Sequence, residues 1–145
     1  MALRITDKIS EIDLARVQLF LKGTVWQSGI GPKTLGRALN NSLCISAFDD
    51  NLQIGFARAV TDRATSCWID DVFVDPAHRG QGVAGRMIES IVQHSELRSV
   101  ASWFLSSSNQ EARRVFAKYG FESIGPERAG KLMARAKIHN EQYST

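Results

Sequence analysis

A basic, glycine-rich turn between an apolar strand and a helix is the part of this sequence best suited to chemistry. The strand residues Val72, Phe73 and Val74 are followed, after Asp75 and Pro76, by Arg79-Gly80-Gln81-Gly82-Val83-Ala84. Gly80 and Gly82 can take positive φ angles and allow phosphate oxygens to approach the backbone closely. The unpaired N–H groups at the start of the next helix point to the same place, and Arg79 adds a positive charge. The turn therefore predicts a pyrophosphate site.

The same glycines also match a different fingerprint. Gly80-Gln81-Gly82-Val83-Ala84-Gly85 is a G-x-G-x-x-G, the motif of dinucleotide-binding folds. That fold requires the glycines directly after a strand that opens the domain, with an acidic residue about 20 positions later. Here residues 75–79 separate strand and glycines, and the next predicted strand, at 102–105, runs into three serines instead of a carboxylate. A nicotinamide-binding domain is therefore disfavoured and is kept only as an alternative.

Length and composition predict a single domain over residues 1–145. The chain is 43% hydrophobic and 23% charged, which is typical of a soluble globular protein with a real core. We expect no membrane segment, because no apolar run reaches about 18 residues. The N-terminal residues lack the apolar segment of a signal peptide, so we expect a cytoplasmic protein. The net charge of +3 is scattered, which favours a small anionic ligand over nucleic acid.

The cysteines and histidines predict no further chemistry. Cys44 and Cys67 lie in apolar segments without a CxxC partner, so we interpret them as buried thiols. His78, His94 and His139 show no ligand spacing, and we predict no metal site.

Hydrophobic periodicity predicts the elements that position the turn. A helix between two strands of one sheet makes those strands parallel, so the strand before the glycine turn and the strand at 102–105 should be parallel neighbours. The expected elements are a strand at 3–5, helices at 14–21 and 32–39, strands at 43–48, 52–61 and 67–74, a helix at 83–94, a strand at 102–105, a helix at 112–119, and closing strands at 121–124 and 131–138.

The spacing Arg79-x-x-Gly82-x-Ala84, together with this element order, resembles the GNAT N-acetyltransferase superfamily over residues 71–121. The resemblance implies an α/β fold of the α+β type: a mixed, mostly antiparallel central sheet of about 6–7 strands with a central parallel pair, flanked by about four helices. It also implies acetyl-coenzyme A (acetyl-CoA) as acyl donor and an N-acetyltransferase that transfers the acetyl group directly to an amine. A narrower resemblance, to small and mostly uncharacterised GNAT proteins, leaves the acceptor open.

The resemblance also assigns residues to the cofactor. The loop from Arg79 to Ala84 would hold the diphosphate, while the backbone of Val72, Phe73 and Val74 would meet the pantetheine arm on a strand that splays from its parallel neighbour. Asn109 falls where the family often places a polar residue on that arm, although a helix N-cap explains it equally well. Phe116 stands where many members have a proton-donating tyrosine, and it cannot donate.

Candidates for proton transfer are the carboxylates before this loop and one tyrosine. A carboxylate on a central strand needs a partner or a cleft. We expect Asp70 to form an ion pair with Arg58 on the neighbouring strand, and Asp71, facing the other side, to act as base or to orient a water. Purely structural roles for both aspartates are an equal alternative. Tyr119 is a candidate acid, although packing is the commoner role for such a residue.

Acceptor contacts are the least defined. Trp26 could supply an aromatic wall for an amine, and Arg58 and Asp62 match the narrower group, although Asp62 also suits an ordinary turn.

We predict an acetyl-CoA-dependent N-acetyltransferase. The alternative, motivated by Phe116, is a non-catalytic coenzyme A-binding regulatory module. The partner is a small-molecule or protein amine, and the resemblance is compatible with a homodimer.

Overall fold

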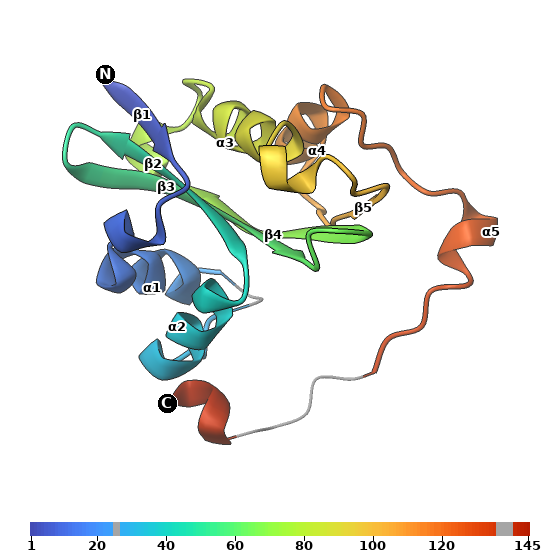
Figure 1. Ribbon diagram of the computed structural model, residues 1–145, viewed down its shortest axis with the longest axis horizontal. Helices are drawn as coiled ribbons and strands as arrows, with labels where there is room; N and C mark the ends of the chain where they lie inside the picture. Colours follow the sequence, from blue (N-terminus) through green and yellow to red (C-terminus); the bar gives the residue numbers. More distant parts are fainter. Residues whose placement is uncertain (25–26, 136–140) are drawn as a thin grey trace.

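The computed structural model describes residues 1–24, 27–135 and 141–145, which form one five-stranded sheet with helices on both faces (Figure 1). The strands lie in the sheet in chain order, and the first four are antiparallel. β5 pairs parallel with β4, as the helical crossover between them requires. The strand bounds are β1 (Leu3–Thr6), β2 (Leu43–Asp49), β3 (Leu52–Thr61), β4 (Ser66–Val74) and β5 (Ser102–Phe104).

Two helices cover each face of the sheet. α1 (Leu14–Lys22) and α2 (Pro32–Asn40) lie on one face, and α3 (Val83–Val92) and α4 (Gln110–Ala117) lie on the other (Figure 1). Local sequence starts these helices: the Asp13 carboxylate accepts the Arg16 N–H at α1, and Pro32 occupies the first turn of α2. The faces carry separate buried clusters. Met87, Ile88 and Ile91 of α3 belong to one, whereas α1 and α2 pack against Cys44, Phe56 and Phe73 in the other.

The structure corrects the prediction of closing strands at 121–124 and 131–138. None of their described residues is in a strand, and the chain between them forms the short helix α5 (Pro126–Ala129); residues 136–138 lie outside the described part. A strand needs a neighbour to bond, and residues 122–124 and 133–135 make no backbone hydrogen bond to described residues. In consequence β5 is the edge of the described sheet, and the parallel pair is at that edge instead of its centre.

The fold class and the other predicted helices and strands agree with the structure. The GNAT-like α/β fold class is confirmed, with fewer described strands than the approximate number we expected. The helices and strands up to α4 lie within a few residues of their predicted positions. Among the described helices, none is both long and apolar enough to cross a membrane.

Candidate active site

The glycine turn leads directly into α3 and presents bare backbone. Gly80 has φ +75° and Gly82 has φ +80°, the left-handed conformation that glycine adopts without strain. Gly82 is the N-cap of α3, and no described side chain caps the helix there. A Cβ placed on either glycine would meet no atom within 4 Å, so the space in front of both is open. The first N–H groups of α3 therefore face an open surface at the positive end of the helix dipole.

Contacts with the strands below fix this turn in place. Arg79 Nε donates to the carbonyl oxygen of Val74 at 2.9 Å, and its guanidinium lies 5.4 Å from the centre of the Phe73 ring. Asp75 N–H donates to Ile54 O at 2.7 Å, and the Asp75 carboxylate pairs with Arg16 at 2.7 Å. Val83 is buried, whereas Gln81 and Gly82 are exposed. The turn is thus fixed on the side that faces the sheet, while its glycines face open space, as anion binding by backbone N–H groups requires.

Among the described residues, no strand pairs with the second half of β4 on its β5 side. The parallel ladder joins only Ser66–Trp68 to Ser102–Phe104. Beyond Trp68, the residues Ile69, Asp70, Phe73 and Val74 pair with β3, and β5 ends at Phe104. This loss of pairing agrees with the divergence of the two strands that the resemblance implied. It leaves the backbone of Val72 and Phe73 without a β5 partner on that edge, whereas the Val74 carbonyl accepts from Arg79.

A β-bulge in the middle of β4 gathers three charged side chains. Phe56 pairs with Phe73 and Arg58 with Asp70, so Ala57 alone stands opposite the two residues Asp71 and Val72. Asp71 has φ +52°, uncommon for a residue other than glycine. The predicted pair of Arg58 and Asp70 is confirmed, with Nη2 to Oδ2 at 3.2 Å.

The bulge also corrects the expectation that Asp71 faces away from Asp70. The Asp71 carboxylate accepts from Arg58 Nε at 2.9 Å, so both aspartates bind one guanidinium. The strand alternation that predicted opposite faces fails because the extra residue rotates the backbone. Arg58 Nη1 also lies 3.3 Å from Ser42 Oγ.

Burial differs sharply within this Arg58 cluster. The Asp71 side chain is 1% exposed and Arg58 is 10% exposed, whereas Asp70 is 34% exposed. Two carboxylates and one guanidinium meet here on the α1–α2 side of the sheet. Such a group is stable only when its hydrogen bonds are satisfied, and its solvent-facing part is the Asp70 carboxylate. The arrangement can therefore hold an ammonium group or accept a proton through a water.

The two tyrosines lie in different clusters. Tyr119, the predicted acid, packs in the α3–α4 cluster, where its hydroxyl comes within 3.6 Å of where a Cβ on Gly85 would stand. Tyr143 packs against the α1–α2 cluster, and its hydroxyl donates to Gln27 Oε1. Burial raises the pKa of Tyr143, and the nearby Asp71 carboxylate raises it further. The structure thus brings Tyr143 toward the Arg58 cluster.

Sequence reasoning missed Tyr143. The residue belongs to η4 (Glu141–Ser144), which returns to the start of α2 in Figure 1. Gly31 N–H donates to Tyr143 O at 3.0 Å, and Lys33 N–H donates to Thr145 O at 3.0 Å. No local pattern marks this contact, because the bonded residues are more than 100 positions apart in the chain.

Other predicted site residues have structural partners. Asn109 Oδ1 accepts the Ala112 N–H at 3.0 Å and caps α4. Phe116 is buried edge-on against Phe121, with ring centres 6.0 Å apart. Asp62 accepts from the Thr65 hydroxyl and from three backbone N–H groups in the β3–β4 turn, which holds its pKa well below the ordinary value. Trp26 lies outside the described residues.

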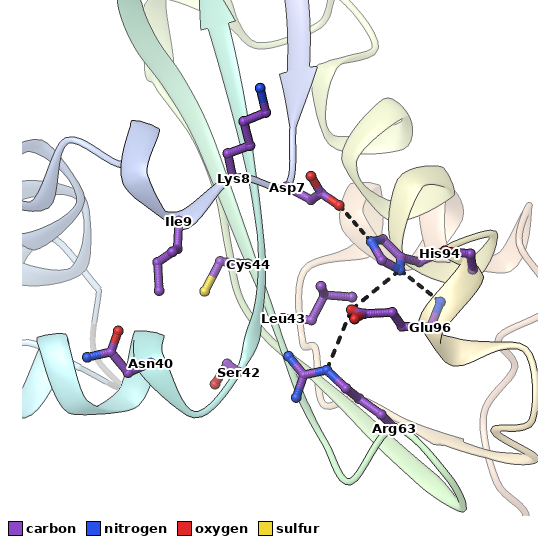
Figure 2. A pocket seen from close by; sticks show the side chains of 11 residues that line it. Asp7, Lys8, Ile9, Asn40, Ser42, Leu43, Cys44, Arg63, His94 and Glu96 are labelled. Atoms are coloured by element: carbon purple, nitrogen blue, oxygen red, sulfur yellow. Dashed lines mark hydrogen bonds and ion pairs between the residues drawn. The ribbon is translucent and has the colours of Figure 1, made fainter.

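A pocket of about 530 Å³ lies away from the glycine turn, between the end of β1, the start of β2 and η3 (Ser95–Leu97) (Figure 2). Figure 2 shows His94 directed at Asp7, with Nε2 and Oδ2 2.9 Å apart. His94 Nδ1 accepts the Glu96 N–H, so both ring nitrogens are engaged. Burial raises the pKa of the Cys44 thiol to about 11, which makes it a poor nucleophile. No described group of residues could hold a metal ion.

Comparison with known proteins agrees with this geometry. A solved GNAT-family acetyltransferase from Xanthomonas campestris pv. campestris is 31% identical and superimposes with a TM-score of 0.84, covering 99% of this chain and 97% of that one. An acetyltransferase from Clostridium acetobutylicum, solved with acetyl-CoA, shares the fold at 22% identity and a TM-score of 0.62, covering 86% and 91% of the two chains.

Curated relatives match over shorter regions. Spermine/spermidine N(1)-acetyltransferase of Bacillus subtilis is 31% identical over 61 residues, which are 40% of each protein. The chain spans between 27% and 56% of the length of the curated relatives it matches. The model of the acetyltransferase (GNAT) domain matches residues 40–123, more than half of the chain and including the Arg58 cluster and the whole glycine turn. The chain therefore belongs to the GNAT acetyltransferase family.

Proposed function

We propose that this protein is an N-acetyltransferase that transfers an acetyl group from acetyl-CoA directly to an amine. The observation that carries the proposal is the turn from Arg79 to Ala84, which presents bare backbone at the N-terminus of α3 beside the unpaired edge of β4. The Clostridium relative solved with acetyl-CoA supports the choice of acyl donor.

The residues present fit coenzyme A. The N–H groups of residues 80–84 would hold the diphosphate, since glycine at 80 and 82 leaves room for its oxygens. The backbone of Val72 and Phe73 and the N–H group of Val74, which β5 does not bond, would meet the pantetheine amides. Phe116 and Asn109 would contribute only through packing and through the position of α4.

The chemistry then needs a deprotonated amine beside the thioester. The amine nitrogen attacks the carbonyl carbon, the carbon–sulfur bond breaks, and the thiolate takes a proton while the amine loses one. Asp71 lies on the strand that would carry the thioester, and we assign it the role of orienting a water that receives the amine proton. Neither cysteine forms part of the path, because both are buried with a raised pKa.

The acceptor is proposed to be a cationic amine. The Asp70 carboxylate of the Arg58 cluster is 34% exposed and would meet an ammonium group on that side of the sheet, and the Bacillus relative is named for polyamines. Arg58 and Asp62 would support the site without contacting the acceptor. Arg58 is engaged by its ion pairs with Asp70 and Asp71, and the Asp62 carboxylate is engaged by the β3–β4 turn. Two free cysteines favour a reducing compartment, and we place the enzyme in the cytoplasm.

The test begins with binding. A ligand that binds only the folded state raises the melting temperature. We expect acetyl-CoA and coenzyme A to raise the melting temperature and NADH to leave it unchanged. A rise with NADH alone would mean that the glycine turn binds a dinucleotide, as the alternative interpretation of the motif predicts.

Release of free thiol from acetyl-CoA is then measured with spermidine, with a lysine-containing peptide and without acceptor. Faster release with an acceptor supports the enzyme. Binding without release, across a panel of amines, would identify the non-catalytic coenzyme A module instead.

A further inference from the structure

The short helix η4 lies against the first turn of α2, on the α1–α2 side of the sheet (Figure 1). Gly31 N–H donates to Tyr143 O at 3.0 Å. The N–H groups of Lys33 and Thr34 donate to Thr145 O at 3.0 and 3.2 Å. No side chain of a described residue caps α2, so the helix itself offers these N–H groups no partner. η4 and the residue after it therefore take the place of a helix cap.

Gly31 is shaped for this contact. A Cβ at Gly31 would stand 2.3 Å from the backbone oxygens of Ser144 and Thr145. The Gly31 backbone is extended, with φ −89° and ψ 167°, which any residue can adopt. It is thus the approach of η4 that requires glycine at this position. Gly36, within the same helix, has nothing within 4 Å of where its Cβ would stand.

Tyr143 is the residue of η4 that reaches the protein interior. It is partly buried, whereas the other residues of η4 are exposed. Its ring packs against the α1–α2 cluster and lies 3.9 Å from where a Cβ on Gly29 would stand. Its hydroxyl donates to Gln27 Oε1. Burial and the nearby Asp71 carboxylate raise the pKa of Tyr143, so the phenol keeps its proton at neutral pH.

Tyr143 and the Arg58 cluster bound the same side of the sheet. Asp70 supplies the solvent-facing carboxylate, at 34% exposure, and Asp71 supplies the buried one, at 1%. Both carboxylates lie close enough to Tyr143 to raise its pKa. A neutral phenol whose proton is already donated can accept a hydrogen bond from an ammonium group, and its ring face attracts a cation. A cationic amine that approaches Asp70 would therefore meet a second favourable group.

We propose that η4 forms one wall of the acceptor site and that Tyr143 is a positioning residue, which accepts a hydrogen bond from the ammonium group of the acceptor beside Asp70. This inference rests on the proposed acetyl transfer to a cationic amine. The contact suits a primary ammonium group, which has three N–H donors to share between Asp70, Tyr143 and water.

Amide hydrogen exchange tests whether η4 is docked, independently of any activity. The N–H groups of Lys33 and Thr34 should exchange slowly in the wild type, because Thr145 O accepts both. Gly31→Ala, whose methyl group takes the place of η4, and a chain that ends at residue 140 should exchange rapidly at both positions. Gly36→Ala, on the same helix, is the matched control and should remain slow. Rapid exchange in the wild type would overturn the proposal.

Kinetics with spermidine and acetyl-CoA test the role of the wall. Gly31→Ala and the chain that ends at residue 140 should raise the KM for spermidine about tenfold, the effect of one lost hydrogen bond to a charged group. Both should leave the KM for acetyl-CoA unchanged, and Gly36→Ala should behave as the wild type. Tyr143→Phe should raise the KM for spermidine similarly, with kcat and the slow exchange of Lys33 retained. A purely structural tyrosine would not separate these quantities.

The outcomes that contradict the proposal are distinct. An unchanged KM for spermidine in Gly31→Ala, Tyr143→Phe and the shortened chain would leave η4 a structural role only. A lower KM or a higher kcat in the shortened chain would show that η4 blocks the acceptor site. Either result, with an active wild type, removes the role of η4 and leaves the proposed function intact. A wild type that releases no thiol with any amine would overturn the proposed function itself, and this inference with it.

Discussion

The glycine turn follows the end of β4, and the Arg58 cluster takes Asp70 and Asp71 from the middle of the same strand, yet the two are built by different means. The turn presents backbone groups, and its geometry follows from glycine at 80 and 82 and from the start of α3. The cluster acts through side chains from β3 and β4, and its geometry depends on one extra residue in the β4 ladder. A site made of backbone is thus encoded within a few consecutive residues, whereas a site made of side chains depends on the register between strands.

The largest expected effect comes from removing the centre of the cluster. Arg58→Met leaves the Asp71 carboxylate buried without its guanidinium, and we expect the free energy of unfolding to fall by about 3–5 kcal/mol. Urea denaturation followed by circular dichroism measures this. Adding Asp71→Asn to Arg58→Met should recover part of the loss. If Arg58→Met is as stable as the wild type, the ion pairs do not organise the bulge.

The two aspartates of the Arg58 cluster differ in burial, so the same substitution should have different effects on stability at the two positions. We expect Asp71→Asn to cost about 1.5–3 kcal/mol, because it weakens a buried charged hydrogen bond. Asp70→Asn should cost under about 1 kcal/mol, since Asp70 is one-third exposed.

The same two variants test the proposed catalytic role of Asp71. If Asp71 orients the proton-accepting water, Asp71→Asn lowers kcat and leaves the KM for acetyl-CoA unchanged. Equal kcat and an equal pH profile in both variants would leave Asp71 a purely structural role.

This contrast explains what the sequence could predict. Local patterns located α1, α2 and α3, the glycine turn before α3, and the pairing of Arg58 with Asp70 across a short hairpin. They could not locate the bulge, because a single inserted residue leaves the apolar pattern of β4 almost unchanged while it reverses the direction of Asp71.

Contacts between distant parts of the chain could not be predicted from the sequence either. Tyr143 reaches the α1–α2 cluster through bonds to residues near 31, and no property of residues 141–145 reveals that destination. The segment 131–135 has a strand-like sequence, but a sequence pattern cannot say whether a neighbouring strand is within reach in the same chain.

The backbone site can be tested with two glycines in the same conformation. Gly82 has φ +80° and Gly120 has φ +90°, and a Cβ on either meets nothing within 4 Å. Alanine at each should cost about 1 kcal/mol of stability through the same strain. Only Gly82→Ala should weaken acetyl-CoA binding, by about tenfold, because its methyl group occupies the space of a phosphate oxygen. Calorimetric titration measures both. Equal affinity in the two variants would remove the turn from the cofactor site.

The smallest effect is expected at Asp62, where the structure and the narrower resemblance give different roles. Its carboxylate accepts from the Thr65 hydroxyl and from the N–H groups of Thr65, Ala64 and Ser66, which hold its pKa below the ordinary value of 3.8. A lowered folded-state pKa contributes stability that is present above the ordinary value and is lost as the pH falls below it. Asp62→Asn should therefore lower the melting temperature slightly at pH 7, by less than Asp70→Asn does, and the difference should vanish in acid.

The kinetics of the Asp62 variant decide between the two roles. A turn residue leaves the KM for the amine unchanged, because the carboxylate is already engaged by three backbone groups. If Asp62→Asn instead raises that KM and leaves the melting temperature unaltered, the β3–β4 turn is part of the acceptor site. The side-chain region of the enzyme would then extend along β3 well beyond the Arg58 cluster.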